Sequence, residues 1–285
     1  MPNLRDIRTR IRSIKNTQQL TYTMKLVSAT KLRRAQEQIL AARPYARRML
    51  QVLNSLATRA HPESHPLLQR REEKSAEVVV ITADRGLCGG FNANILKAAL
   101  GEIQRREGTE VAVTAVGKKA RDFFRRRRVA MRREMVDVFK KVSYAHAADL
   151  AQDLMKLYIS GERDAIYLVY NEFKSAIQQR IVGEKLLPIE KLPEEEKLLP
   201  VDYLYEPSQQ EIFNQLLPKH VEVQVFRALL ESAAAEHGAR MSAMDSATRN
   251  AADLIDSLTL HMNKVRQAGI TNEILEVVAG AAALE

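Results

Sequence analysis

Apolar residues recur at alternating spacings of three and four over the first sixty residues of the chain. The series runs through Leu4, Ile7, Ile11, Ile14, Gln18, Thr21, Lys25, Ser28, Leu32, Ala35, Ile39, Ala42, Ala46, Met49, Leu53, Leu56 and Ala60. Thirteen of these seventeen positions are apolar, and a heptad sustained this long predicts a coiled-coil helix. Pro44 disturbs helical hydrogen bonding locally. Because the apolar stripe continues across it, we expect one helix over residues 4–60.

A second series of the same kind ends the chain. It runs through Phe226, Leu230, Ala233, His237, Arg240, Met244, Ala247, Ala251, Leu254, Leu258, His261, Val265, Ala268, Asn272, Leu275, Ala279 and Ala282. Thirteen of seventeen positions are again apolar, so we expect a helix from Val221 to Leu284. Ser208 and Glu211 form a capping box that predicts a short helix before it. Pro218 suits the first turn of the long one.

The middle of the chain alternates between short apolar runs and helical patterns. Strands are expected at 77–82, 110–116, 165–173 and 178–187, and helices at 92–106, 118–126 and 144–161. Alternation of this kind predicts an α/β domain with a mostly parallel sheet.

Two long helices at opposite ends of one chain have an economical arrangement, which is antiparallel pairing. The expected fold class is therefore α/β, in which a long antiparallel two-helix coiled coil formed by the N- and C-terminal helices carries an inserted Rossmann-like α/β domain. The expected division is residues 1–62, 76–190 and 208–285. The C-terminal helix is the longer, so its apolar end at 270–284 should project and need a partner cavity.

Charge is unevenly distributed along the chain. The net charge is +9, but residues 1–50 hold twelve basic and two acidic residues, whereas residues 219–285 hold six basic and nine acidic ones. The N-terminal helix therefore needs an acidic partner, which could be nucleic acid or an acidic protein surface. The single cysteine excludes an internal disulfide. No apolar run reaches 18 residues, so no transmembrane helix is expected.

Candidate chemistry is sparse. Cys88 follows the first strand, where α/β folds place ligands, but no histidine motif supports a nucleophile and a lone cysteine is usually a small buried residue. The nearby glycines match neither common nucleotide-binding spacing. Asp84 and Arg85 are expected to form a structural pair at this turn. We identify no catalytic, cofactor-binding or metal-binding residue and expect no cofactor.

Three other polar features have open interpretations. His61 and His65 are four apart, but neighbouring prolines favour a linker over a helical metal site. The basic run at 125–128, with Arg132 and Arg133, is expected to be a solvated loop. The polar seam positions at 18–28 indicate either a surface that faces something other than the partner helix or a hydrogen-bonded stretch of seam.

Three segments carry a resemblance to a known family. They are Met24–Ala35, Thr82–Asn92 and Asn263–Glu273, the last followed by the apolar residues up to Leu284. In order and spacing they resemble the gamma subunits of F-type ATP synthases over essentially the whole chain. The resemblance implies a non-catalytic rotor shaft that transmits torque between a membrane ring of c subunits and catalytic beta subunits. It also implies a bacterial source and a peripheral position on the cytoplasmic side of the cell membrane.

The same resemblance implies partners and contact residues. The partners are three alpha and three beta subunits, an epsilon subunit and the c-ring. The residues that match beta-subunit contacts of the family are Met24, Lys25, Arg266, Gln267, Thr271 and Glu273. The residues that match its c-ring contacts are Tyr203, Tyr205 and Glu206.

Two other functional classes remain to be weighed. The high isoelectric point, about 9.6, allows a basic coiled-coil nucleic-acid-binding protein, for which binding should fall steeply with salt. Such a protein has no use for the apolar C-terminal end or the α/β insertion. A Rossmann enzyme with helical extensions would require nucleotide binding or turnover by the isolated chain.

Overall fold

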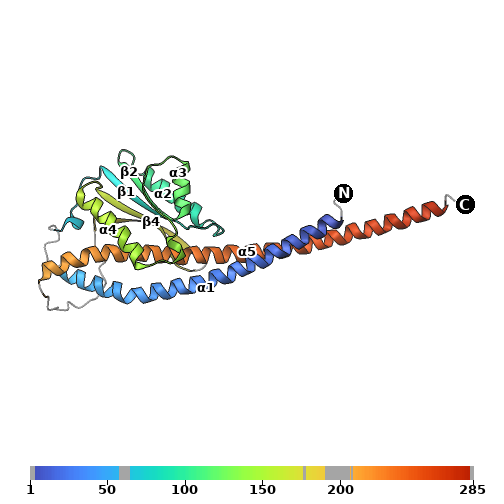
Figure 1. Ribbon diagram of the computed structural model, residues 1–285, viewed down its shortest axis with the longest axis horizontal. Helices are drawn as coiled ribbons and strands as arrows, with labels where there is room; N and C mark the ends of the chain where they lie inside the picture. The colour runs from blue at the N-terminus through green and yellow to red at the C-terminus, as the bar shows by residue number, and fades with distance from the viewer. Residues whose placement is uncertain (1–3, 58–64, 176–177, 190–205, 207, 283–285) are drawn as a thin grey trace. The chain divides into compact units, whose positions relative to one another are not determined.

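The computed structural model describes residues 4–57, 65–175, 178–189, 206 and 208–282. The chain forms two compact units. Unit 1 comprises residues 1–28 and 241–285, and unit 2 comprises residues 29–240. Two helices, α1 (Leu4–Ala57) and α5 (Gln209–Ala282), contribute to both units (Figure 1). The division at 1–62, 76–190 and 208–285 stays a prediction.

A five-stranded sheet forms the centre of unit 2. Its order is β3-β2-β1-β4-β5, parallel except for the antiparallel pair β4–β5. The strands are β1 (Ser75–Ile81), β2 (Glu110–Val116), β3 (Met131–Met135), β4 (Ala165–Phe173) and β5 (Gln179–Leu187). The helices between them are α2 (Phe91–Gln104), α3 (Lys118–Arg126) and α4 (Tyr144–Ser160), with short 3-10 turns at Pro66–Leu68 and Val138–Lys140. The predicted α/β fold with a mostly parallel sheet is confirmed.

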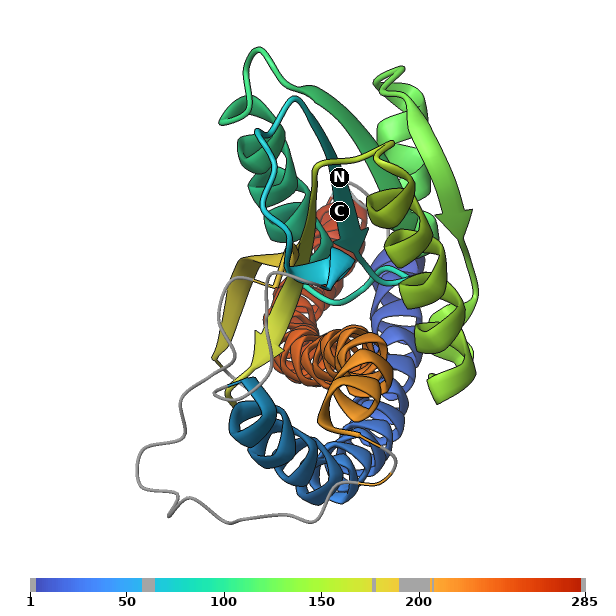
Figure 2. The same cartoon turned by 90° about the vertical axis from the view of Figure 1, so that its left-hand side faces the viewer.

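Each face of the sheet has its own apolar core, because alternate side chains of a strand point to opposite faces. Val79 and Ile81 pack with α4, with α5 residues up to Leu229 and with the end of α1. Val78 and Val80 pack with α2 and α3 on the other face. Figures 1 and 2 show α4 and α2 on opposite sides of the sheet.

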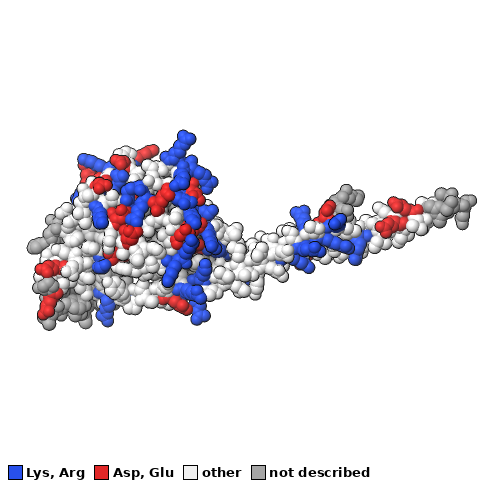
Figure 3. Space-filling model, viewed as in Figure 1, with Lys and Arg blue, Asp and Glu red and all other residues white. Residues whose placement is uncertain are grey.

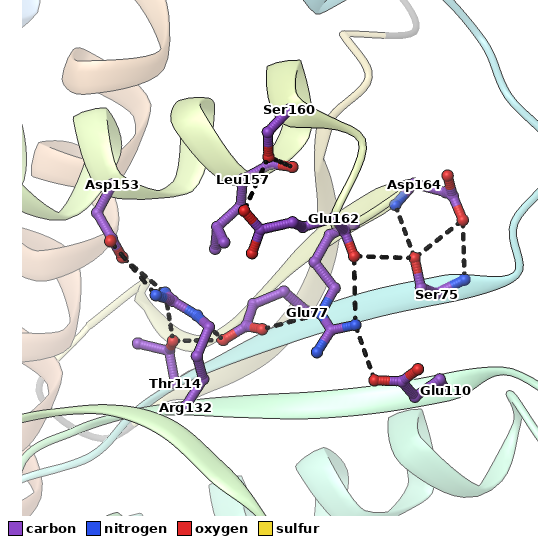
Figure 4. A network of polar contacts seen from close by, with 11 residues as sticks. Ser75, Glu77, Glu110, Thr114, Arg132, Asp153, Leu157, Ser160, Glu162 and Asp164 are labelled. Carbon is purple, nitrogen blue, oxygen red and sulfur yellow. Dashed lines mark hydrogen bonds and ion pairs between the residues drawn. The ribbon is translucent and has the colours of Figure 1, made fainter.

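Strand β3 was not expected, because its sequence is mainly charged. Arg132 and Arg133 are half-buried residues of this edge strand, which corrects the expectation of a solvated loop. Arg132 lies 3.2 Å from a carboxylate oxygen of Glu77, a fully buried residue of β1 (Figure 4). It also binds Asp153 at 2.6 Å. These ion pairs hold the middle of the edge strand, while Met131 and Met135 at its ends pack against the two apolar clusters.

The two long helices are paired antiparallel within each unit. In unit 1, Thr21 contacts Thr248 and Lys25 contacts Asp245, so residue numbers rise on one helix as they fall on the other. In unit 2, Leu53 lies in the same apolar cluster as Leu217 and Val221. The contacts of unit 1 give the predicted antiparallel direction, and Figure 1 shows the two ribbons running in opposite directions in unit 2 as well.

The predicted seam of α1 is confirmed over its described length. Every predicted position from Leu4 to Leu53 is buried or half-buried, whereas most positions between them are exposed. The seam of α5 is confirmed in full as far as Ala251 and only in part beyond it, where the predicted positions Leu258 and Val265 are half-buried. Beyond it the predicted positions Leu254, His261 and Ala268 are exposed. In place of these three, the next residues along the helix, Ile255, Met262 and Gly269, are half-buried. A helix of 3.6 residues per turn drifts against a strict heptad, and here one of the two rows of seam positions moves by one residue.

The expectation of two helices around Pro218 is wrong, because α5 is continuous from Gln209 to Ala282. A proline has no N–H for the carbonyl four residues earlier, which is that of Asn214. The imidazole of His65 hydrogen-bonds to this carbonyl, so the acceptor is not left unpaired. One half of the predicted capping box is present, since the Glu211 N–H donates to the Ser208 hydroxyl at 3.2 Å.

Candidate functional site

The turn after β1 lies at the carboxyl end of the parallel strands. Asp84 accepts hydrogen bonds there from the backbone N–H groups of Lys118 and Asp137, both at 3.0 Å, and of Phe139 at 3.4 Å. Its carboxylate therefore occupies the N-terminus of α3, where a phosphate could otherwise bind. The predicted pair with Arg85 is wrong: among the described residues Asp84 has only these backbone partners, and Arg85 is exposed.

Cys88 in the same turn is not placed for catalysis. Its side chain is only 2% exposed, and Asn92 donates a hydrogen bond to its sulfur at 3.1 Å. Burial raises the pKa of the thiol, which keeps it protonated and weakly nucleophilic. Within the described ranges no group of three or more His, Cys, Asp or Glu side chains could hold a metal ion.

A residue of helix α5 hydrogen-bonds to this turn. The guanidinium of Arg240 donates to the carbonyl of Gly86 at 3.1 and 3.3 Å and pairs with Glu236 at 2.7 Å. Leu87 between these fixed residues is 64% exposed and has the left-handed φ of 60°. The turn thus presents an apolar side chain outward between residues that hydrogen bonds hold in place.

The predicted contact residues near the end of α5 are all exposed. Arg266, Gln267, Thr271 and Glu273 lie on one helix, and the Thr271 hydroxyl donates to the Gln267 carbonyl at 3.0 Å. Every residue from Thr271 to Ala279 is exposed. The large apolar side chains in this region, each half exposed or more, are Ile270, Ile274, Leu275, Val277 and Val278. At the offset between the helices seen in unit 1, the first residue of α1, Leu4, lies opposite a residue of α5 that precedes this segment.

The predicted contact residues of α1 have a different environment. Met24 and Lys25 are both half-buried, and the Lys25 ammonium lies 2.6 Å from a carboxylate oxygen of Asp245. Thr21 and Thr248 share a hydrogen bond of 2.8 Å. Of the two interpretations of this polar stretch, the structure favours a hydrogen-bonded seam. Sequence reasoning missed Asp245 and Thr248, because they lie beside the 3-4 series rather than in it.

The remaining predicted site residues are placed only in part. Tyr203 and Tyr205 lie outside the described residues, whereas Glu206 is described and exposed. The start of α1 carries an exposed basic surface, visible in Figure 3, made of Arg5, Arg8, Arg10, Arg12 and Lys15. No described helix is both long and apolar enough to cross a membrane.

Comparison with known proteins gives one consistent result. A family model described as ATP synthase matches residues 3–284. The ATP synthase gamma chains of Solibacter usitatus and Pelotomaculum thermopropionicum are 53% and 50% identical to this chain, with all of each chain covered.

Solved structures show the same fold at lower identity. A chain of the Euglena gracilis mitochondrial ATP synthase (OSCP/F1/c-ring, rotational state 3) has a TM-score of 0.67 at 22% identity, covering 99% of this chain and 94% of that one. A chain of the central stalk and c-ring of the Tetrahymena thermophila mitochondrial enzyme has a TM-score of 0.61 at 24% identity, covering 80% and 99%.

Proposed function

Because this chain belongs to the gamma-chain family of ATP synthases, we propose that it is the central rotor shaft of an F-type, proton-translocating complex. In this role it transmits torque between a membrane ring of c subunits and three catalytic beta subunits, which alternate with three alpha subunits. The chain supplies no catalytic residue. Its position is peripheral, on the cytoplasmic side of the cell membrane.

The exposed end of α5 is the observation that carries this proposal. Large apolar side chains that are exposed over two turns of a helix mark a surface that a partner covers. The hexamer of alpha and beta subunits supplies such an enclosure. The polar face of Arg266, Gln267, Thr271 and Glu273 then meets a loop of one beta subunit at a time.

Charge supports a second contact with the beta subunits. The exposed basic surface at the start of α1 fits an acidic loop on each beta subunit in turn. Met24 is proposed to lie in this contact together with the aliphatic stem of Lys25. The nucleic-acid alternative is not supported, since the relatives reported above are ATP synthase gamma chains.

Contact with the c-ring is proposed for Tyr203, Tyr205 and Glu206, and an epsilon subunit is the expected neighbour of the α/β domain. The double variant Tyr205→Ala, Glu206→Ala should reduce ATP-driven proton pumping in membranes, while ATPase activity of the detached soluble complex stays normal. A control change at Gln215, an exposed residue near the start of α5, Gln215→Ala, should alter neither. Normal pumping in the double variant would remove these residues from the c-ring contact.

The role itself is tested by assembly. Tagged chain expressed with alpha and beta subunits should co-purify as one copy per three alpha and three beta subunits, with ATPase activity that the isolated chain lacks. Substituting Leu275 and Val278 by aspartate should prevent this assembly, although the isolated chain remains folded. Recovery of the chain without alpha and beta subunits, together with steeply salt-dependent DNA binding, would overturn the proposal in favour of the nucleic-acid alternative.

A further inference from the structure

The helix pair of unit 1 has an inverted distribution of polar and apolar side chains over residues 18–28 of α1. The seam positions Gln18, Thr21, Lys25 and Ser28 are polar, yet they are the buried or half-buried ones. The large apolar side chains of the same segment, Leu20, Tyr22, Leu26 and Val27, are each about half exposed or more. An ordinary surface helix has the reverse pattern.

The inward polar groups of α1 are matched by polar groups on α5. The Thr21 and Thr248 hydroxyl oxygens are 2.8 Å apart, and the Lys25 ammonium is 2.6 Å from Oδ1 of Asp245. The other oxygen of Asp245 lies 3.0 Å from the guanidinium of Arg249 on its own helix. Both oxygens of this carboxylate are therefore used, and the hydrogen bond from Lys25 lowers its pKa.

Apolar seam contacts alone do not define one register. Within unit 1, the buried or half-buried residues Met244, Ala251, Leu258 and Val265 of α5 recur every seven residues, so a shift of one heptad exchanges one set of apolar contacts for another. Such a shift would bring Thr21 to Ile255 and Lys25 to Ala252. Both polar contacts would then be lost at once, and an ammonium and a carboxylate would lie against apolar side chains.

We propose that Thr21, Lys25, Asp245 and Thr248 form a register lock that selects one alignment of α1 against α5 in unit 1. This inference does not depend on the proposed rotor function. A half-exposed ion pair adds little to stability, and apolar replacements of buried pairs are often neutral or stabilising. The lock therefore contributes specificity of alignment, in the way that single polar seam residues do in other coiled coils.

A three-cysteine form of the full chain measures the alignment directly. In a Cys88→Ser background, Ile14→Cys is combined with Ile255→Cys and Met262→Cys. At the observed offset residue 14 lies opposite residue 255, and after a shift of one heptad it lies opposite residue 262. Because a disulfide needs Cα atoms within about 7 Å, peptide mapping after mild oxidation reports the ratio of the two alignments.

With the lock intact, the 14–255 disulfide should dominate. The apolar double substitution Lys25→Met, Asp245→Leu should leave helix content and the melting midpoint unchanged or higher, while the ratio of 14–255 to 14–262 disulfide falls by about fivefold or more. The exchanged pair Lys25→Asp, Asp245→Lys should restore the ratio. An unchanged ratio in the apolar variant would overturn the proposal, and so would an exchanged pair that behaves like the apolar variant.

Discussion

Units 1 and 2 solve the problem of burial in different ways. Unit 2 encloses two apolar clusters and contains fully buried side chains such as Leu53, Tyr158 and Phe213. Among the described residues of unit 1, only Ile7, Ser28, Met244 and Ala251 are buried. The difference is geometric, since a lone pair of helices can bury one stripe of each helix and nothing more. Unit 2 thus supplies its own stability, whereas unit 1 leaves apolar surface for a partner to cover.

The contrast is sharpest for a pair of leucines. Leu53→Ala removes a side chain with no exposed surface in the core of unit 2 and should lower the free energy of unfolding by about 3–4 kcal/mol. Leu275→Ala, at a position 60% exposed in unit 1, should change it by less than about 0.5 kcal/mol in the isolated chain. Denaturant unfolding of the two variants decides the matter. If both variants lost the same free energy of unfolding, the exposed apolar side chains of unit 1 would already be buried without a partner.

A buried charge in unit 2 offers the next largest effect. Glu77 is fully buried and is bound by Arg132, Thr114 and, at 3.6 Å, Arg163 (Figure 4). Glu77→Ala leaves two guanidinium groups without this partner. Because each guanidinium keeps a second carboxylate partner, the free energy of unfolding should fall by about 3 kcal/mol, the lower end of the range for breaking a buried ion pair.

The exposed pair Arg125–Glu134 provides the matched control for Glu77. Glu134→Gln should cost less than about 1 kcal/mol, as surface ion pairs do. A Glu77→Ala variant as stable as the Glu134→Gln variant would show that the buried network contributes no more than a surface pair.

Much of this contrast is visible in the sequence. The seam of α1 was predictable because apolar residues at a heptad spacing can bury only one face. The shift of the α5 seam after Ala251 was not, since it depends on the accumulated drift of a long helix against its partner. Strand β3 was missed because its arginines are paired with Glu77 and Asp153, which are distant in sequence. The carbonyl that Pro218 leaves without a helical partner likewise finds one in His65, which is distant in sequence.

The proposed contact residues also differ in how far the sequence alone identifies them. Those on α5 could be identified from the family resemblance, and their exposure agrees with a contact role that stays a prediction. The pairing of Lys25 with Asp245 could not be identified, because the sequence leaves the offset between the two helices open. A one-residue change in that offset would place a different side chain opposite Lys25. Polar partners across an interface are therefore the part of the site that requires coordinates.

Acid should weaken unit 2 through a buried histidine. Burial lowers the pKa of His220 to about 4, below the ordinary value of 6.5, so the unfolded chain takes up a proton more readily than the folded one. The stability that the neutral imidazole allows is complete above pH 6.5 and is lost as the pH falls towards 4. The slope for this one group should reach about 1.4 kcal/mol per pH unit within that window.

His220→Leu should flatten the dependence on pH. Nδ1 of His220 has no hydrogen-bond partner among the described residues, so leucine leaves no polar group unpaired. The free energy of unfolding should be measured for the variant and the wild type at pH 8, 6, 5 and 4. The two proteins should have similar values at pH 8, and the variant should be increasingly more stable than the wild type as the pH falls. An unchanged slope would show that the buried His220 does not govern this acid sensitivity.

The smallest effect is expected at the exposed end of unit 1, and it should appear only in the assembled complex. Gln267→Leu with Thr271→Val removes polar groups that are exposed in the isolated chain, so its melting midpoint should not change. In the complex, the loss of a hydrogen bond worth about 1 kcal/mol during each rotational step should lower steady-state ATPase activity about fivefold, with assembly retained.

Thr259→Val is the matched control, because its hydroxyl also donates to a carbonyl one turn earlier, at 2.7 Å, but lies outside the proposed contact. Normal turnover in a correctly assembled double variant would leave the residues of this face as packing alone. Reduced turnover in the double variant but not in Thr259→Val would place a rate-controlling contact on a surface that adds nothing to the stability of the chain itself. That outcome would extend the difference between the two units from folding to function.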